Sequence, residues 1–152
     1  MVSIISFIKH NDNKMMTVQA WAYAAWYRFL IRFRSRKHLE KHWGVLGEET
    51  DRTLTLEQYK YARLVSRQVN RIANHTPWES KCLVRALAAR RFLCKKKISN
   101  TLYLGVGKDE TGKMVAHAWI RAGAAYVTGG DGSEYATVAM FKNEFKDEDQ
   151  GD

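Results

Sequence analysis

The sequence of 152 residues contains little proline and little cysteine, with one proline, two cysteines and ten glycines. This scarcity of proline and glycine excludes collagen-like and low-complexity chains. Two cysteines are too few for a disulfide scaffold or a four-cysteine zinc site. Hydrophobic residues make up 45% of the chain, which is enough to fill the core of one compact domain.

Long apolar runs are also lacking. The apolar stretch at residues 18–33 is interrupted by Arg28 and Arg32. It is also shorter than the about 20 residues that a membrane-spanning helix needs. Residues 1–8 are apolar but lack a preceding basic segment and a following small-residue cleavage site, so no signal peptide is expected. We therefore expect a cytoplasmic protein without stable membrane insertion, whose two cysteines are free thiols.

Positive charge is what the sequence has in excess, with 25 Lys and Arg against 16 Asp and Glu, a formal net charge of +9. The basic residues concentrate in the first two thirds of the chain. A basic nucleic-acid-binding module is therefore one hypothesis, above all for residues 28–41, where aromatic side chains are interleaved. A solvated amphipathic helix, or one lying on a membrane surface, explains the same pattern. No helix-turn-helix, zinc-finger or RNA-binding strand motif supports the nucleic-acid hypothesis.

Apolar spacing of three to four residues predicts helices in the first two thirds of the chain. One helix is expected over residues 17–43. A second begins at Thr55, because Thr55 and Gln58 have the spacing of a capping box. A third, rich in alanine and leucine, begins either at Pro77 or at Lys81.

After residue 100 the apolar period changes from 3.6 to 2, which predicts strands. The short connections between them are typical of antiparallel pairing. Helices followed by an antiparallel sheet define an α+β fold. The expected strands are residues 101–106, 114–121, 125–128 and 135–141.

Cys82 is a candidate nucleophile because it is expected near the N-terminus of the third helix. The free backbone amides and the helix dipole favour a thiolate there, and Lys81 adds positive charge. A buried, inert thiol is the alternative interpretation. Cys94 lies late in the same helix, where the dipole opposes a thiolate, and is expected to have no catalytic role.

His117 and Asp131 are the other two candidates. A hairpin turning at residues 123–124 would place His117 opposite residues 129–131. The Asp131 carboxylate could then accept the ring N–H and direct the other ring nitrogen toward Cys82. The alternatives are a histidine satisfied on a sheet face and an ordinary turn aspartate.

Several motifs together resemble the lasso-peptide leader peptidases, which are small cysteine proteases of the transglutaminase-like superfamily. They are Trp78 with residues 82–87 (Cys-Leu-Val-Arg-Ala-Leu), then 104–106 (Leu-Gly-Val), 116–119 (Ala-His-Ala-Trp) and 127–131 (Val-Thr-Gly-Gly-Asp). The resemblance covers about residues 76–141. It implies a papain/transglutaminase-like core in which the helix with the cysteine packs on the sheet with the histidine and aspartate.

The expected organisation is one compact unit of three parts. A helical region comes first, then the cysteine-protease core, then an acidic tail. These parts are residues 1–54, 55–145 and 146–152.

The resemblance implies removal of the leader peptide from a lasso precursor, with a leader-recognition protein and a lasso cyclase as partners and no metal or organic cofactor. Cys82 would be the nucleophile and its backbone N–H an oxyanion donor, and His117 would be the acid and base. Asp131, or a backbone or water partner, would orient His117. Trp78 and Trp119 are candidate walls of a substrate groove, or core residues. Transglutaminase-like acyl transfer would use the same nucleophile and remains the enzymatic alternative.

Overall fold

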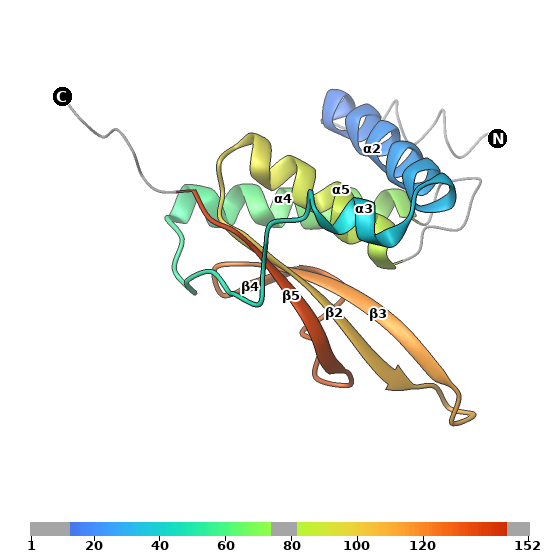
Figure 1. Cartoon of the computed structure of the whole chain (residues 1–152). Coiled ribbons are helices and arrows are strands. Elements are labelled where there is room, and N and C mark those ends of the chain that lie inside the picture. The colour runs from blue at the N-terminus through green and yellow to red at the C-terminus, as the bar shows by residue number, and fades with distance from the viewer. Residues whose placement is uncertain (1–12, 74–81, 146–152) are drawn as a thin grey trace.

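The computed structural model describes residues 13–73 and 82–145. Helices cover one face of a five-stranded antiparallel sheet, which confirms the predicted α+β class (Figure 1). The helices are α2 (Lys14–Phe33), α3 (Arg36–Glu40), α4 (Leu56–Ala73) and α5 (Cys82–Lys95). The strands are β1 (Val45–Leu46), β2 (Asn100–Lys108), β3 (Met114–Ala122), β4 (Ala125–Thr128) and β5 (Ala136–Asn143).

The single helix predicted over residues 17–43 is wrong in extent. The backbone becomes extended at Arg34, which separates α2 from the short helix α3. Ser35 caps α3, because its hydroxyl accepts a hydrogen bond from the His38 N–H at 3.4 Å. The break turns the chain back on the core, so that Leu39 and Trp43 become buried.

The predicted capping box at the start of α4 is confirmed. The Thr55 hydroxyl accepts from the Gln58 N–H at 3.2 Å, and the Gln58 side chain accepts from the Thr55 N–H at 3.0 Å. Both bonds satisfy backbone donors that a helix start leaves free. The two starts predicted for the third helix, Pro77 and Lys81, lie outside the described residues, and α5 is described from Cys82.

The strands form a sheet in the order β1-β5-β2-β3-β4. The four predicted strands correspond to β2 to β5. The two-residue β1, paired with β5, was missed because two residues carry no alternating pattern. The far ends of β2 and β3 project beyond the helical layer (Figure 1), and Met114 at the start of β3 is 67% exposed.

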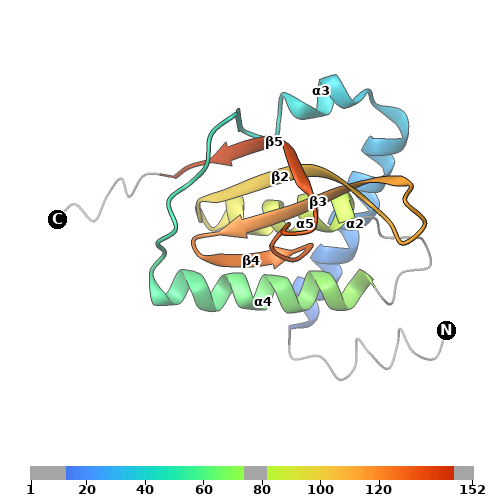
Figure 2. The same cartoon turned by 90° about the horizontal axis from the view of Figure 1, so that it is seen from below.

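The core lies between the sheet and α5, which is behind the strands in Figure 2. Leu102 and Leu104 of β2 and Ala118 and Ile120 of β3 face the helices. Because side chains alternate along a strand, Trp119 between the two β3 core residues lies on the other face. Trp119 is nevertheless only 3% exposed, since loops cover that face as well.

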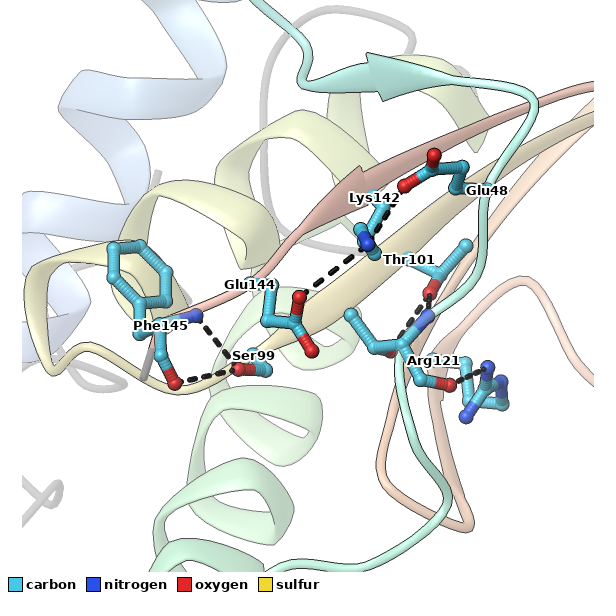
Figure 3. Close-up of polar contacts among 8 residues, drawn as sticks. Glu48, Ser99, Thr101, Arg121, Lys142, Glu144 and Phe145 are labelled. Carbon is cyan, nitrogen blue, oxygen red and sulfur yellow. Dashed lines mark hydrogen bonds and ion pairs between the residues drawn. The ribbon is translucent and has the colours of Figure 1, made fainter. Parts of the chain in front are cut away.

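The fully buried side chain of Arg121 connects loop segments to the outer face of the sheet through hydrogen bonds. Its guanidinium donates to the Tyr103 hydroxyl at 2.9 Å, to the Thr50 carbonyl at 2.9 Å and to the Gly123 carbonyl at 2.6 Å. Thr50 is held in turn by its N–H, which donates to the Thr101 hydroxyl at 3.0 Å (Figure 3). The segment between β1 and α4 therefore has a fixed position on the sheet.

A second set of polar contacts holds the C-terminal end of β5 (Figure 3). Lys142 forms ion pairs with Glu48 at 2.7 Å and with Glu144 at 3.3 Å. The Ser99 hydroxyl accepts from the Phe145 N–H at 2.9 Å. These contacts attach the segment after β1 to β5, and the residues after β5 to Ser99, which directly precedes β2.

Candidate active site

Cys82 opens the described part of α5, and in both views the start of this helix lies over β3 (Figures 1 and 2). The side chain is half-buried and packs against the hydrophobic core, and its thiol forms no disulfide. Cys94 is also a free, half-buried cysteine. Its sulfur accepts a 3.5 Å hydrogen bond from the Asn100 amide, which gives this second thiol a packing role.

The His117 ring is oriented by a backbone carbonyl. Its Nε2 lies 2.7 Å from the carbonyl oxygen of Gly129. A carbonyl oxygen can only accept a hydrogen bond, so Nε2 carries the proton of the neutral ring. Nδ1 is then the unprotonated nitrogen, which is the form that can accept a proton from a thiol.

An aromatic cluster holds the His117 ring on the outer face of the sheet. Tyr135 stacks on the ring, with centroids 4.3 Å apart and an interplanar angle of 22°. Trp119 lies 5.8 Å from the ring and is itself stacked on Tyr103 at 5.3 Å. Trp119 is therefore a buried support for the histidine, and the expectation that it forms a wall of an open groove is not met.

Glycines make this arrangement possible at two positions. Gly129 has φ +78°, a left-handed conformation that L side chains rarely adopt, and its carbonyl reaches His117 from the turn after β4. Gly105 pairs with His117 in the neighbouring strand, and a Cβ atom there would lie 2.8 Å from the Trp119 ring. The absence of a side chain at Gly105 thus leaves room for the indole.

Asp131 lies in the polar turn that follows, and its carboxylate is solvent-exposed. It accepts a hydrogen bond from the Ser133 N–H at 2.9 Å, and this bond is the main cause that lowers the pKa of Asp131 below its ordinary value. The expected hydrogen bond between Asp131 and His117 is absent, and the Gly129 carbonyl takes that position. The observed partner of the His117 ring is therefore a backbone group. It is the carbonyl of Gly129, the residue that directly follows the end of β4.

The structure does not join the three predicted catalytic side chains by any hydrogen bond. Cys82 packs on the helical side of the core, whereas the His117 ring belongs to the outer face with Trp119. Among the described residues, β4 pairs only with the last part of β3, from Ile120 to Ala122. The turn at Gly129 covers the edge at Ala118 and Trp119, whereas residues 114–117 have only β2 beside them among the described strands, so thiol and imidazole would have to meet at this edge.

A family model of the transglutaminase-like superfamily matches residues 23–140. The chain belongs to this superfamily. The match runs from within α2 almost to the end of β5, and so crosses the expected boundary after residue 54. No curated protein and no solved structure shows a significant match.

Membership of the transglutaminase-like superfamily indicates a cysteine peptidase or acyltransferase. Both reactions pass through a thioester on a cysteine. Trp78, the other predicted groove residue, lies outside the described residues. Within the described parts of the chain, no group of His, Cys, Asp and Glu side chains could hold a metal ion, and no helix is long and apolar enough to cross a membrane.

Sequence reasoning missed one residue of the His117 environment and left another open. The sequence predicts Tyr135 only as the first residue of a strand, and no local signal links it to His117. The sequence leaves two candidate partners for His117, the Asp131 carboxylate and a backbone group. Only the path of the turn after β4 brings the Gly129 carbonyl to the ring.

Proposed function

We propose that this transglutaminase-like domain is a cysteine peptidase that removes the leader from a lasso peptide precursor in the cytoplasm. The observation that carries the proposal is the 2.7 Å contact between His117 Nε2 and the Gly129 carbonyl, which leaves Nδ1 as a base. The superfamily match supports a cysteine nucleophile, and the motifs around Cys82 and His117 support the substrate class. A leader-recognition protein and the lasso cyclase are the proposed partners.

The reaction begins when His117 Nδ1 takes the proton of the Cys82 thiol. The thiolate attacks the carbonyl carbon at the junction of leader and core, and the Cys82 backbone N–H stabilises the oxyanion. The imidazolium protonates the leaving amine, and a thioester remains on Cys82. His117 then takes a proton from water, which attacks the thioester, releases the leader and restores the thiol.

The unpaired edge of β3 supports a peptide as substrate. Gly129 lies against the Ala118 carbonyl and Trp119, so within the described chain the open edge of β3 is residues 114–117. An extended peptide can add to such an edge through main-chain hydrogen bonds. Binding there would bring the peptide next to His117. It would also seat the scissile carbonyl at the edge where Cys82 has to approach the ring.

Acyl transfer is the second candidate, because the superfamily includes acyltransferases and the same thioester can react with an amine. The two reactions differ in product mass. Hydrolysis releases the leader as a free acid, whereas transfer links it to the amine. Mass spectrometry of the products with an added primary amine therefore separates the two reactions.

The central experiment incubates the chain with a lasso precursor and its recognition protein and follows the products by mass spectrometry. We expect one cut at the leader–core junction. Cys82→Ala and His117→Ala abolish the cut, whereas the matched control Cys94→Ala retains it. Continued cleavage by Cys82→Ala would overturn the proposal.

A second experiment separates the possible partners of His117. If Asp131 assists the histidine during turnover, Asp131→Asn lowers the cleavage rate. If the Gly129 carbonyl is sufficient, the rate of Asp131→Asn stays close to that of the unmodified chain. Thermal melting of the variant provides the control, since Asn can still accept the hydrogen bond from the Ser133 N–H.

A further inference from the structure

A row of exposed aromatic side chains runs along α2, far from His117 in the chain. Trp26, Phe29 and Phe33 are 56%, 50% and 69% exposed. Their spacing of three and four residues places them on one side of the helix, and their ring centroids are 6.0 and 4.8 Å apart. Contiguous exposed aromatic surface of this kind is typical of binding sites rather than of inert protein surface.

A groove of about 400 Å³ adjoins this row, between α2, α3 and α5. Trp26 belongs to both the row and the groove. Aliphatic side chains from two helices, Leu30, Ile31 and Leu87, contribute to the lining. The groove depends on the break between α2 and α3, because the turn at Arg34 folds α3 back beside the end of α2.

The charged groups of the groove are cations. Arg90 and Arg91 line it, and no Asp or Glu does so within the described residues. The Arg90 guanidinium already has hydrogen-bond partners within the protein, since it donates to the His42 carbonyl at 2.7 Å and to the Asn143 side chain at 2.9 Å. Arg91 is exposed and forms no ion pair with any described residue. Its guanidinium lies 5.9 Å from the centre of the Tyr23 ring and interacts electrostatically with the Tyr27 hydroxyl. An apolar groove beside an unpaired guanidinium is complementary to an apolar side chain that has a carboxylate nearby.

We propose that this aromatic–arginine groove, formed by α2, α3 and α5 together with the exposed aromatic row, docks a segment of a partner polypeptide. The segment inserts a large apolar side chain between the helices and places a carboxylate against Arg91. The site is distinct from the candidate active site, because it includes Cys94, which lies about 18 Å along α5 from Cys82 at 1.5 Å per residue.

Three other occupants fit the groove less well. A second copy of the chain carries the same net charge of +9, so two copies repel each other. A bilayer surface cannot fill a concave site between helices. An oligonucleotide offers phosphates and flat bases, whereas Leu30, Ile31 and Leu87 form an aliphatic lining that suits neither.

The test selects short random peptides displayed on phage against the Cys82→Ala chain, so that binding is measured without catalysis and independently of the hydrolase proposal. We expect the selected peptides to combine large apolar residues with Asp or Glu. Fluorescence anisotropy of a labelled selected peptide should show at least about a tenfold weaker Kd for Arg91→Glu and for Phe29→Ser, as for interface hot spots. The matched control Arg63→Glu reverses an exposed charge on α4 and should change Kd by less than about twofold.

Several results would overturn the proposal. They are no enrichment of peptides, selected peptides without carboxylates, or an unchanged Kd in both groove variants. Binding to phosphatidylglycerol vesicles or to oligothymidylate that is lost in the same variants would replace the peptide with a membrane or a nucleic acid. Concentration-dependent dimerisation that Phe29→Ser abolishes would show that a second copy occupies the groove. Circular dichroism and melting of each variant distinguish loss of binding from loss of folding.

Discussion

The imidazole of His117 is restrained from several directions by groups that come from different strands and loops. The Gly129 carbonyl determines which nitrogen carries the proton, and Tyr135 and Trp119 determine where the ring lies. A base of fixed tautomer and fixed position loses less entropy when it takes up a proton in a reaction. The same restraints explain why a buried tryptophan and two glycines surround a half-buried histidine.

Replacement of Tyr135 tests this restraint. Tyr135→Leu removes the stacked ring, and we expect kcat for the proposed leader cleavage to fall about tenfold while KM changes little, because the base is misplaced rather than removed. Tyr135→Phe keeps the ring and should stay within about twofold of the unmodified chain. Equal kcat values for the two variants would show that stacking on His117 has no part in catalysis.

Tyr103 provides a pH-dependent contribution to stability. Burial, and next the hydrogen bond to Glu49, raise the pKa of Tyr103 above its ordinary value of 10.0, although Arg121 acts in the opposite direction. The folded chain therefore holds this proton more tightly than the unfolded chain. The stabilisation is complete below about pH 10 and is lost as the pH rises through the higher folded pKa.

We therefore expect the free energy of unfolding to fall above pH 10.0, the ordinary pKa of tyrosine. Tyr103→Phe should show a shallower alkaline decline, although it is less stable at neutral pH because Arg121 loses an acceptor. Part of the decline should remain, since burial also raises the pKa of Tyr27 and of Tyr61. Urea unfolding at a series of pH values measures both slopes, and identical slopes would contradict the assignment to Tyr103.

At the scale of single elements, the stability of α4 depends on the capping hydrogen bonds of its first turn. The reciprocal bonds of Thr55 and Gln58 satisfy donors that no later part of the helix can reach. The apolar stripe of Ala62, Val65, Val69 and Ile72 is buried. The cap sets where α4 begins, and the stripe sets which side faces α5.

Thr55→Ala should destabilise the chain by about 1 kcal/mol, the usual effect of removing an N-cap hydroxyl. The matched control is Thr53→Ala, which removes an exposed hydroxyl before the helix and should change stability by less than about 0.5 kcal/mol. Urea unfolding followed by circular dichroism measures both values. A loss at Thr53 equal to the loss at Thr55 would mean that the cap contributes nothing.

The elements also show where sequence periodicity succeeds and where it fails. The first and last residues of β4, Ala125 and Thr128, were predicted correctly. The turn at Gly123 and the glycine pair after Thr128 mark the two ends of this strand in the sequence. The break at Arg34 was not predicted, because residues 34–38 contain no glycine or proline that would mark the end of a helix. Leu39 and Trp43 are buried only when α3 turns back onto the core, a gain that depends on the packing partners.

Over the whole molecule, positive charge is concentrated in the helical layer. Glu40 and Glu57 are the only acidic residues in the four described helices, against many lysines and arginines. Arg63 and Arg67 on α4 have no ion pair within the described chain and lie four residues apart on one side of the helix. Like charges at this spacing repel each other and oppose folding.

Salt should therefore stabilise the chain. Raising NaCl from low to physiological concentration shortens the Debye length to about 8 Å and screens the repulsion, so Tm should rise. The double variant Arg63→Gln and Arg67→Gln should show a smaller rise, because part of the repulsion is already absent. Differential scanning calorimetry measures both, and a Tm that falls with NaCl would contradict this account of the charge.

Local pattern was sufficient for the order of the main helices and the four longer strands and for the cap at Thr55. These features depend on residues within a few positions of one another, and the periods of 3.6 and 2 carry that information. The partner of His117, the buried site of Arg121 and the groove beside α2 came from folding alone. Arg121 reaches the Thr50 carbonyl across 71 positions, and no local pattern contains a contact between residues that only the folded chain brings together.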